Sequence, residues 1–294
     1  MLIDRGVPIF VVRILAFWYQ RQAFCAQWGT AQSQWFCTSN GVRQGGVISP
    51  KLFNVYVDGL TPRLLRSEVG CNLNGTWINH IMYADDLTLL SPTAKGLQKL
   101  LDICSVYAQE YDIVFNIEKS VCLYFECKKF KLLNVPHVLL DGRKLDYHES
   151  HKVLGMVIEC TGSDKQDISR QIRGLYCRGN MLLRKFSQCS DNVKRQLFIS
   201  YCTSMYCFHL WSQFTLAQMQ KLRVAYNNIF RRFFRLPPRC SASEMFVHSD
   251  VPTLDMLLRK SVYSFEQRVK HSRNALLSTV SGSDLTLTNE LWLR

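Results

Sequence analysis

The stretch "IMYADDLTLL", residues 81–90, places two carboxylates side by side between two apolar runs. Each run is typical of a short strand, so Asp85 and Asp86 fall where a tight hairpin turns. The dipeptides that turn a hairpin most easily are Asn-Gly and Asp-Gly, not two adjacent like charges. We therefore expect a bound cation at this turn, with the alternative that both aspartates are ordinary turn residues.

Composition places the chain among globular proteins and gives it a basic second half. Its 294 residues are 47% hydrophobic, which excludes global disorder and suits one large domain or two ordinary ones. The net charge of +13 divides into 15 − 13 = +2 for residues 1–150 and 21 − 10 = +11 for residues 151–294. A basic half indicates a polyanionic partner, either nucleic acid or an anionic membrane surface, or else a soluble basic surface.

The cysteines and the apolar runs argue against a zinc site and a membrane span. None of the 12 cysteines forms a C-x-x-C pair, and such unpatterned thiols suit a reducing compartment. No run reaches the roughly 20 apolar residues of a transmembrane helix. The first 20 residues predict a helix after Gly-Val-Pro, with Phe10, Ile14, Phe17 and Trp18 on one face, rather than a signal peptide.

The first half predicts a mixed α and β structure. Ser49 and Pro50 are typical of a helix start, and Thr61-Pro62 either kinks that helix or restarts it. The further predicted elements are a strand before the Gly-rich loop 41–46, a helix over 91–111, strand-turn-strand over 112–125, an Asp-Gly hairpin near 141 and a strand over 152–159.

The second half predicts helices. Apolar residues recur at helical spacing from Asp164 to Phe186, then over 192–211, over 216–236 and over 253–272. Pro237-Pro238 ends the third of these helices, and Ser241–Glu244 is a capping box for a short one after it. The tail after Ala275 carries weak signals. The fold class expected is α+β followed by an all-helical region.

Four motifs in a fixed order give the chain a family resemblance. They are G-V-R-Q-G-G-V-I-S-P-x-L-F at 41–53, Y-A-D-D at 83–86, N-I-E-K-S at 116–120 and V-L-G-M at 153–156. This order resembles the reverse transcriptases of non-LTR (LINE-type) retrotransposons, and more distantly those of group II introns and retrons. The resemblance implies a partial right-hand polymerase palm over 1–160, an antiparallel sheet with packed helices, then a helical thumb and C-terminal region over 161–294.

The chemistry that the resemblance implies is nucleotidyl transfer from a dNTP to a DNA primer on an RNA template, with two Mg²⁺ (or Mn²⁺) ions. Asp85 would be the main metal ligand and Asp86 its neighbour at the same site. Lys119 would protonate or neutralise the departing pyrophosphate, or simply be exposed at a strand end. Mg²⁺ prefers carboxylate oxygens, which fits the acidic pair.

Two further segments would contact the substrates. Gln44 and Gly45 would lie along the templating base and the incoming nucleotide, unless the loop is a plain turn before a helix. Tyr83 and Ala84 would lie near the primer terminus, with ordinary strand packing as the alternative for Tyr83.

The segment "NNIFRRFFRLPPR" at 227–239 interleaves basic and aromatic residues. Its arginines are Arg231, Arg232, Arg235 and Arg239. Such a helix can follow the phosphates of a nucleic acid, and its binding then weakens steeply with salt. It can equally be a solvated face over a core stripe, or a helix on a membrane surface.

The family also uses an aspartate on an earlier strand, and this sequence has no match for it. Asp4 is the only acidic residue before Asp58, and the residues around Asp4 differ from the family motif. We therefore expect a truncated reverse transcriptase whose isolated chain has little or no polymerase activity. The alternatives are a non-catalytic nucleic-acid-binding remnant and, third, a helical interaction module with an incidental hairpin. The family implies an intracellular, nucleus-associated role.

Overall fold

The computed structural model describes residues 1–38, 41–73, 75–126 and 134–281. The chain divides into two compact units. Unit 1 comprises Met1–Val114 and Val138–Gly142, and unit 2 comprises Phe115–His137 and Arg143–Arg294. The strands between residues 121 and 159 thus belong mainly to the same unit as the helices that follow them, and a functional boundary at residue 160 stays a prediction.

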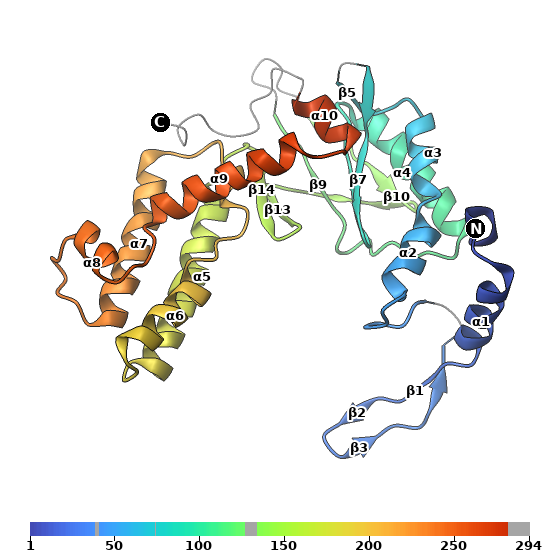
Figure 1. Cartoon of the computed structure of the whole chain (residues 1–294). Helices are drawn as coiled ribbons and strands as arrows, with labels where there is room; N and C mark the ends of the chain where they lie inside the picture. The colour runs from blue at the N-terminus through green and yellow to red at the C-terminus, as the bar shows by residue number, and fades with distance from the viewer. Residues whose placement is uncertain (39–40, 74, 127–133, 282–294) are drawn as a thin grey trace. The chain divides into compact units, whose positions relative to one another are not determined.

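Unit 1 combines short helices with small antiparallel hairpins (Figure 1). Its elements are the 3₁₀ helix η1 (Ile3–Arg5), α1 (Ile9–Gln20), β1 (Ala23–Phe24), β2 (Gln27–Trp28), β3 (Ala31–Gln32), β4 (Phe36–Cys37), α2 (Ser49–Val57), α3 (Leu60–Arg66), β5 (Cys71–Leu73), β6 (Thr76–Ile78), β7 (His80–Tyr83), β8 (Asp86–Leu89), α4 (Ala94–Glu110) and β10 (Leu139–Leu140). The predicted helices and the 81–90 hairpin are confirmed.

The helices of unit 1 begin in different ways. The break between α2 and α3 places Thr61-Pro62 in the first turn of α3, so the helix restarts there. Ser49 is the first helical residue and makes no cap, with Pro50 next to it. Helix α4 begins after Thr93, whose hydroxyl accepts a hydrogen bond from the Gly96 amide at 3.1 Å, slightly later than predicted.

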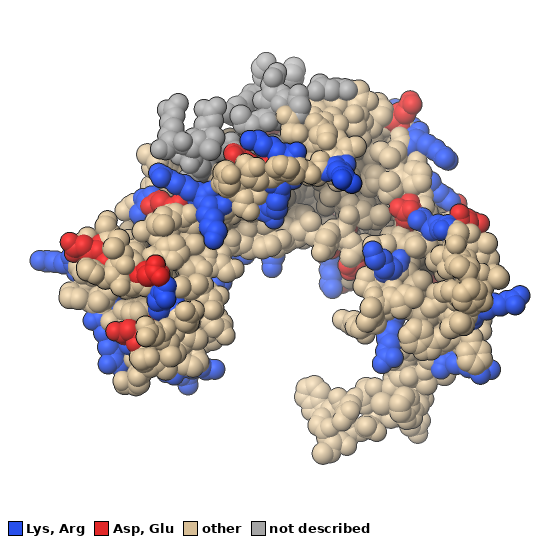
Figure 2. Space-filling model, viewed as in Figure 1, with Lys and Arg blue, Asp and Glu red and all other residues tan. Residues whose placement is uncertain are grey.

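The N-terminal part of unit 1 leaves apolar surface exposed. The predicted apolar face of α1 forms, but none of the residues of this helix is buried. Residues 22–42 contain no charged side chain, and in Figure 2 the β1–β4 hairpin is correspondingly uncoloured. Trp28 in β2 is 90% exposed and Trp35 is 70% exposed.

Unit 2 places small strand pairs before a set of packed helices (Figure 1). Its elements are β9 (Val121–Leu123), β11 (Arg143–Lys144), β12 (Asp146–His148), β13 (Ser150–Val153), β14 (Met156–Glu159), α5 (Lys165–Phe186), α6 (Asp191–Cys202), the 3₁₀ helix η2 (Phe208–Leu210), α7 (Leu216–Phe234), α8 (Ala242–His248), α9 (Leu254–Lys270) and α10 (Ala275–Ser281). Strand β9 pairs in parallel with β12, and β13 pairs antiparallel with β14. The tail beyond residue 281 lies outside the described residues.

Three predicted elements of unit 2 differ from the structure. The 112–125 segment contains only one strand, β9, after a turn at 117–119. The predicted strand over 152–159 is a hairpin, because Leu154 and Gly155 both adopt positive φ (46° and 89°) and turn the chain. The helix predicted over 192–211 ends at Cys202. The chain that follows is not α-helical up to Trp211, whose ring is fully buried in the core.

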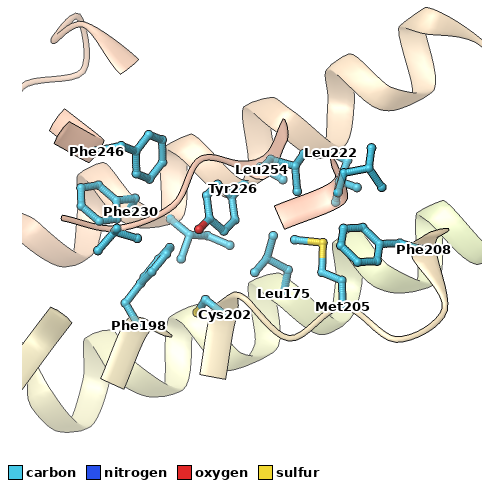
Figure 3. Packing of buried hydrophobic residues seen from close by; sticks show 14 of the residues in the cluster. Leu175, Phe198, Cys202, Met205, Phe208, Leu222, Tyr226, Phe230, Phe246 and Leu254 are labelled. Carbon is cyan, nitrogen blue, oxygen red and sulfur yellow. The ribbon is translucent and has the colours of Figure 1, made fainter. Parts of the chain in front are cut away.

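The core of unit 2 is aromatic and aliphatic. Phe198 of α6 contacts Tyr226 and Phe230 of α7 edge to face, and all three rings are fully buried (Figure 3). Leu175 from α5 and Phe246 from α8 point into the same cluster. Because α5, α7 and α9 bury a face of regularly spaced apolar residues, their periodicity was sufficient to predict them.

One buried carboxylate joins three parts of unit 2. The Asp167 side chain is fully buried, and its Oδ1 accepts hydrogen bonds from the Val157 amide (3.0 Å) and Arg170 Nε (2.8 Å). Its Oδ2 accepts from the Trp211 indole N–H at 2.9 Å. These bonds tie β14 and the segment before α7 to α5, and they explain why the chain leaves the helical path after Cys202.

Candidate functional site

The acidic pair lies at the tip of the β7–β8 hairpin. Tyr83 pairs with Asp86, so Ala84 and Asp85 form a two-residue turn. Ala84 has a φ of +52° at the first position of this turn, where hairpins ordinarily use Gly, Asn or Asp. A non-glycine residue in this conformation costs roughly 1 kcal/mol. The turn is therefore not built from the residues that make it most stable.

The side chains at the tip are accessible and unpaired. Tyr83, Asp85 and Asp86 are all exposed, and neither carboxylate forms an ion pair or hydrogen bond with any residue that the structure describes. Directly paired residues in antiparallel strands project to the same face, so Tyr83 and Asp86 share one face of the hairpin. That face presents an aromatic ring beside a carboxylate.

The base of the hairpin is anchored by a buried amide. The Asn79 side chain is fully buried, and its Nδ2 donates to the carbonyls of Leu64 (2.7 Å) and Val69 (2.9 Å). Its backbone carbonyl accepts from the Leu90 amide at 2.8 Å, which closes the hairpin at its other end. A Cβ on Gly70 would lie only 2.3 Å from the Asn79 Cβ, so Gly70 is needed for this close approach.

His80 completes the anchor. Its Nδ1 lies 2.8 Å from Asn79 Oδ1 and its Nε2 lies 3.2 Å from the Thr61 hydroxyl in α3. Burial lowers the pKa of His80 below its usual value, because a charged ring would lose its hydration there. The hairpin base is thus fixed to α3 by neutral hydrogen bonds, while the acidic tip stays in solvent.

The Gly-rich loop belongs to the same unit as the hairpin. Gly41 and Gly45 have positive φ (103° and 80°), and both Gln44 and Gly45 are exposed. A Cβ on Gly46 would lie 2.6 Å from Ser49 Oγ, so the loop runs close to the start of α2. The predicted turn before a helix is present, and the role of Gln44 and Gly45 toward a nucleotide stays a prediction.

Lys119 belongs to unit 2. It is exposed and closes a turn in which its amide donates to the carbonyl of Asn116 at 3.2 Å and to the side chain of that residue at 3.1 Å. This confirms Asn116 as a turn residue. Its proximity to the Asp85–Asp86 pair, which unit 1 carries, stays a prediction.

The four predicted arginines differ in their surroundings. Arg231 is half-buried and donates to the Cys240 carbonyl at 3.0 Å and to Asn228 Oδ1 at 3.3 Å. Arg232, Arg235 and Arg239 are exposed, and no carboxylate among the described residues pairs with them. The neighbouring Phe230 and Phe233 are buried in the core, so the aromatic part of the motif is structural.

The acidic tip supplies only part of a metal site. Its exposed, unpaired carboxylate oxygens are the donors that hard divalent cations prefer. Within the described residues, however, no group of three or more His, Cys, Asp or Glu side chains could hold a metal ion. Asp85 and Asp86 therefore fit as two ligands of an ion, not as a complete protein cage.

Sequence reasoning missed the residues that position the tip. Asn79 and Gly70 carry no catalytic signature, and the only signal is a polar residue inside an apolar strand run followed by His80. Such a residue is either exposed or held by buried partners, and the sequence does not distinguish the two.

The first half of the chain matches a known protein family. The model of the reverse transcriptase (RNA-dependent DNA polymerase) family matches residues 7–158, more than half of the 294 residues. The chain belongs to this family. Its characterised relatives place it with the polymerases of non-LTR retrotransposons, as the order of its motifs implied.

Three relatives illustrate the similarity. The Pol polyprotein of the type-2 retrotransposable element R2DM from Drosophila melanogaster is 44% identical over 87 residues, 30% of this chain and 8% of that protein. The RNA-directed DNA polymerase of the mobile element jockey, from the same organism, is 22% identical over 247 residues, which are 80% of this chain and 26% of that protein. The R2 Pol polyprotein from Popillia japonica is 28% identical over 142 residues, which are 46% of this chain and 23% of that protein. The matches cover about a quarter of these proteins or less.

We expect Asn79→Ala to lower the opening free energy of the hairpin base by about 2 kcal/mol, because the Val69 carbonyl loses its donor and the Leu64 carbonyl keeps only its bonds from Ser67. Hydrogen exchange of peptides from α3 and β7 measures this. Asn180→Ala, at an exposed position of α5, is the matched control and should change stability by less than about 0.5 kcal/mol. A loss of that small size for Asn79→Ala would contradict the anchoring role.

The hairpin base should also lose stability in mild acid. His80 has a lower pKa in the folded than in the unfolded state, so its contribution is complete above the unfolded value of about 6.5 and is lost as the pH falls through the folded value. Exchange of β7–β8 peptides between about pH 7.5 and pH 5, corrected for intrinsic rates, reports this loss. His80→Gln should flatten the dependence, and an unchanged slope would exclude His80 as its cause.

Proposed function

We propose that this chain carries the acidic catalytic hairpin of an RNA-directed DNA polymerase. The observation that supports it is the pair of exposed, unpaired carboxylates of Asp85 and Asp86 on a strained turn with a buried anchor. An acidic pair that served only to turn the chain would gain nothing from an alanine at positive φ. The family match over residues 7–158 gives the reaction class.

The reaction is attack of a primer 3′-hydroxyl on the α-phosphate of a dNTP, with pyrophosphate as the leaving group. Divalent ions, which this family generally uses, activate the hydroxyl and neutralise phosphate charge when they are bound. Asp85 and Asp86 would hold them, since their oxygens have no other partner among the described residues. Tyr83, on the same face as Asp86, would pack against the primer terminus, and Lys119 would neutralise the pyrophosphate.

The remaining parts of the chain would hold the nucleic acid. Unit 1 would contribute to a polymerase palm, with Gln44 and Gly45 along the templating base and the incoming nucleotide. The helices of unit 2 would form the thumb. RNA template and DNA primer are accordingly the proposed partners. Within the described residues, no helix is both long and apolar enough to cross a bilayer.

The isolated chain should bind nucleic acid better than it polymerises. Two neighbouring carboxylates on one turn approach a cation from one side, and the described residues contain no third acidic ligand beside them. Loss of a ligand removes several kcal/mol of transition-state stabilisation, hence orders of magnitude in rate. The second candidate function, nucleic-acid binding without catalysis, is favoured by the exposed and unpaired Arg232, Arg235 and Arg239.

In a primer-extension assay with an RNA template, a DNA primer, dNTPs and Mg²⁺ or Mn²⁺, we expect the isolated chain to incorporate no nucleotide above background. The Asp85→Ala variant serves as the matched control for a contaminating polymerase. Incorporation by the wild-type chain that disappears in Asp85→Ala would overturn the proposed inactivity and would establish a complete site.

The chain should bind an RNA–DNA duplex with an affinity that falls steeply as salt rises. Replacing Arg232, Arg235 and Arg239 with Gln should reduce the salt slope by up to about three, one for each phosphate that is no longer neutralised. The control replaces three exposed basic residues of α3 and α4, Arg66, Lys95 and Lys99, and so changes the net charge equally. Fluorescence anisotropy across a salt series measures both, and equal slopes in the two variants would refute a role for the arginine segment.

A further inference from the structure

A shallow apolar groove runs between α5 and α7 of unit 2. Its volume is about 480 Å³. It is lined by Ile172, Tyr176, Ala217, Gln220, Lys221, Val224 and Ala225. The α5 residues are spaced by four positions, and the α7 residues by three or four, so the groove follows the helix axes over about two turns.

Part of the groove lining is exposed to solvent. Ala225 is buried in the core, and Ile172 and Tyr176 are half-buried against it. By contrast, Val224 in the groove is 43% exposed, and Leu216, one residue before Ala217, is 80% exposed. Apolar side chains left exposed beside a groove are a feature of interaction sites.

The two helices that form the groove carry mainly positive charge. Helix α5 contains six Lys and Arg residues and one acidic residue, and α7 contains four Lys and Arg residues and none that is acidic. The single acidic residue, Asp167, is fully buried and bonded to Arg170. Lys221 lies in the lining itself, and the exposed Arg173 follows Ile172. Because Arg223 of α7 is paired with Asp255 of α9, Lys221 and Arg173 are the cations that would attract a ligand combining an apolar face with negative charge.

We propose that this groove binds an acidic amphipathic helix of a protein partner. Apolar side chains of the helix, three or four residues apart, would fill the groove beside Ile172 and Val224, and its carboxylates would face Lys221 and Arg173. A nucleic acid fits less well, because it is bound chiefly through its phosphates and the lining offers them only one cation. The proposal goes beyond the polymerase function and does not depend on it.

The test uses the full chain and a fluorescein-labelled peptide of about 18 residues, with Leu at helical spacing and Glu and Ala elsewhere. A peptide of the same composition with its Leu residues scattered separates groove binding from charge attraction. We expect Val224→Asp to weaken binding of the amphipathic peptide roughly 10-fold. Val193→Asp, at a helical valine of α6 with 46% exposure, should leave it unchanged, and Ala217→Glu is a second groove variant.

Charge reversal provides an independent arm. Lys221→Glu should weaken binding of the acidic peptide and strengthen binding of a peptide in which Lys replaces each Glu. Circular dichroism at each step establishes that the variants are folded. Equal binding of the scattered-Leu peptide, or equal effects of the Asp substitutions at 224 and 193, would overturn the proposal. The proposal would also be overturned if the groove variants lowered the affinity for an RNA–DNA duplex and left the affinity for the peptide unchanged. That result would assign the groove to nucleic acid.

Discussion

The candidate site depends on one buried amide. Asn79 sits at the base of the β7–β8 hairpin, and its side chain satisfies carbonyls at the end of α3 and in the segment that follows. Without such a donor the Val69 carbonyl would lose its hydrogen bond, and the Leu64 carbonyl would keep only its bonds from the Ser67 amide and hydroxyl, at a cost of about 1–3 kcal/mol. The approach is close enough that only glycine fits at position 70. A short hairpin, which would be marginal on its own, is thereby held firmly at one end.

The free end of that hairpin contrasts with its base. Ala84 adopts a backbone conformation that glycine would adopt without strain, and Asp85 and Asp86 repel each other without a neighbouring cation from the described residues. Both features lower stability, and neither is compensated by a contact within the described part of the chain. Local strain and unpaired charge that persist on an otherwise well-anchored element are typical of functional sites. A hairpin under selection for stability alone would use Asn-Gly at this turn.

Sequence patterns predicted the elements whose stability is local or periodic. Helices α5, α7 and α9 follow from apolar spacing, and the acidic hairpin follows from two apolar runs flanking Tyr83–Asp86. The patterns failed where a distant contact decides the conformation. Nothing near Trp211 indicates that its indole will bond to Asp167, 44 residues earlier, and so α6 was predicted too long. Leu154 at positive φ carries no turn signature, so the sequence pattern predicts one strand where the structure has the β13–β14 hairpin. The acidic residues of the site were thus predictable, and the anchor that positions them was not.

In the basic half of the sequence, the aromatic and the basic residues have separate structural roles. The segment around Arg231 combines aromatic and basic residues, but the structure separates their roles, with Phe230 and Phe233 in the core and Arg231 bonded to the Cys240 carbonyl. Arg232 of α7 and Arg173 of α5 remain exposed without a carboxylate partner among the described residues, whereas Arg223 and Arg170 are paired with Asp255 and Asp167. Such charge repels itself and lowers the stability of the folded unit. The anionic partners proposed above would relieve this repulsion.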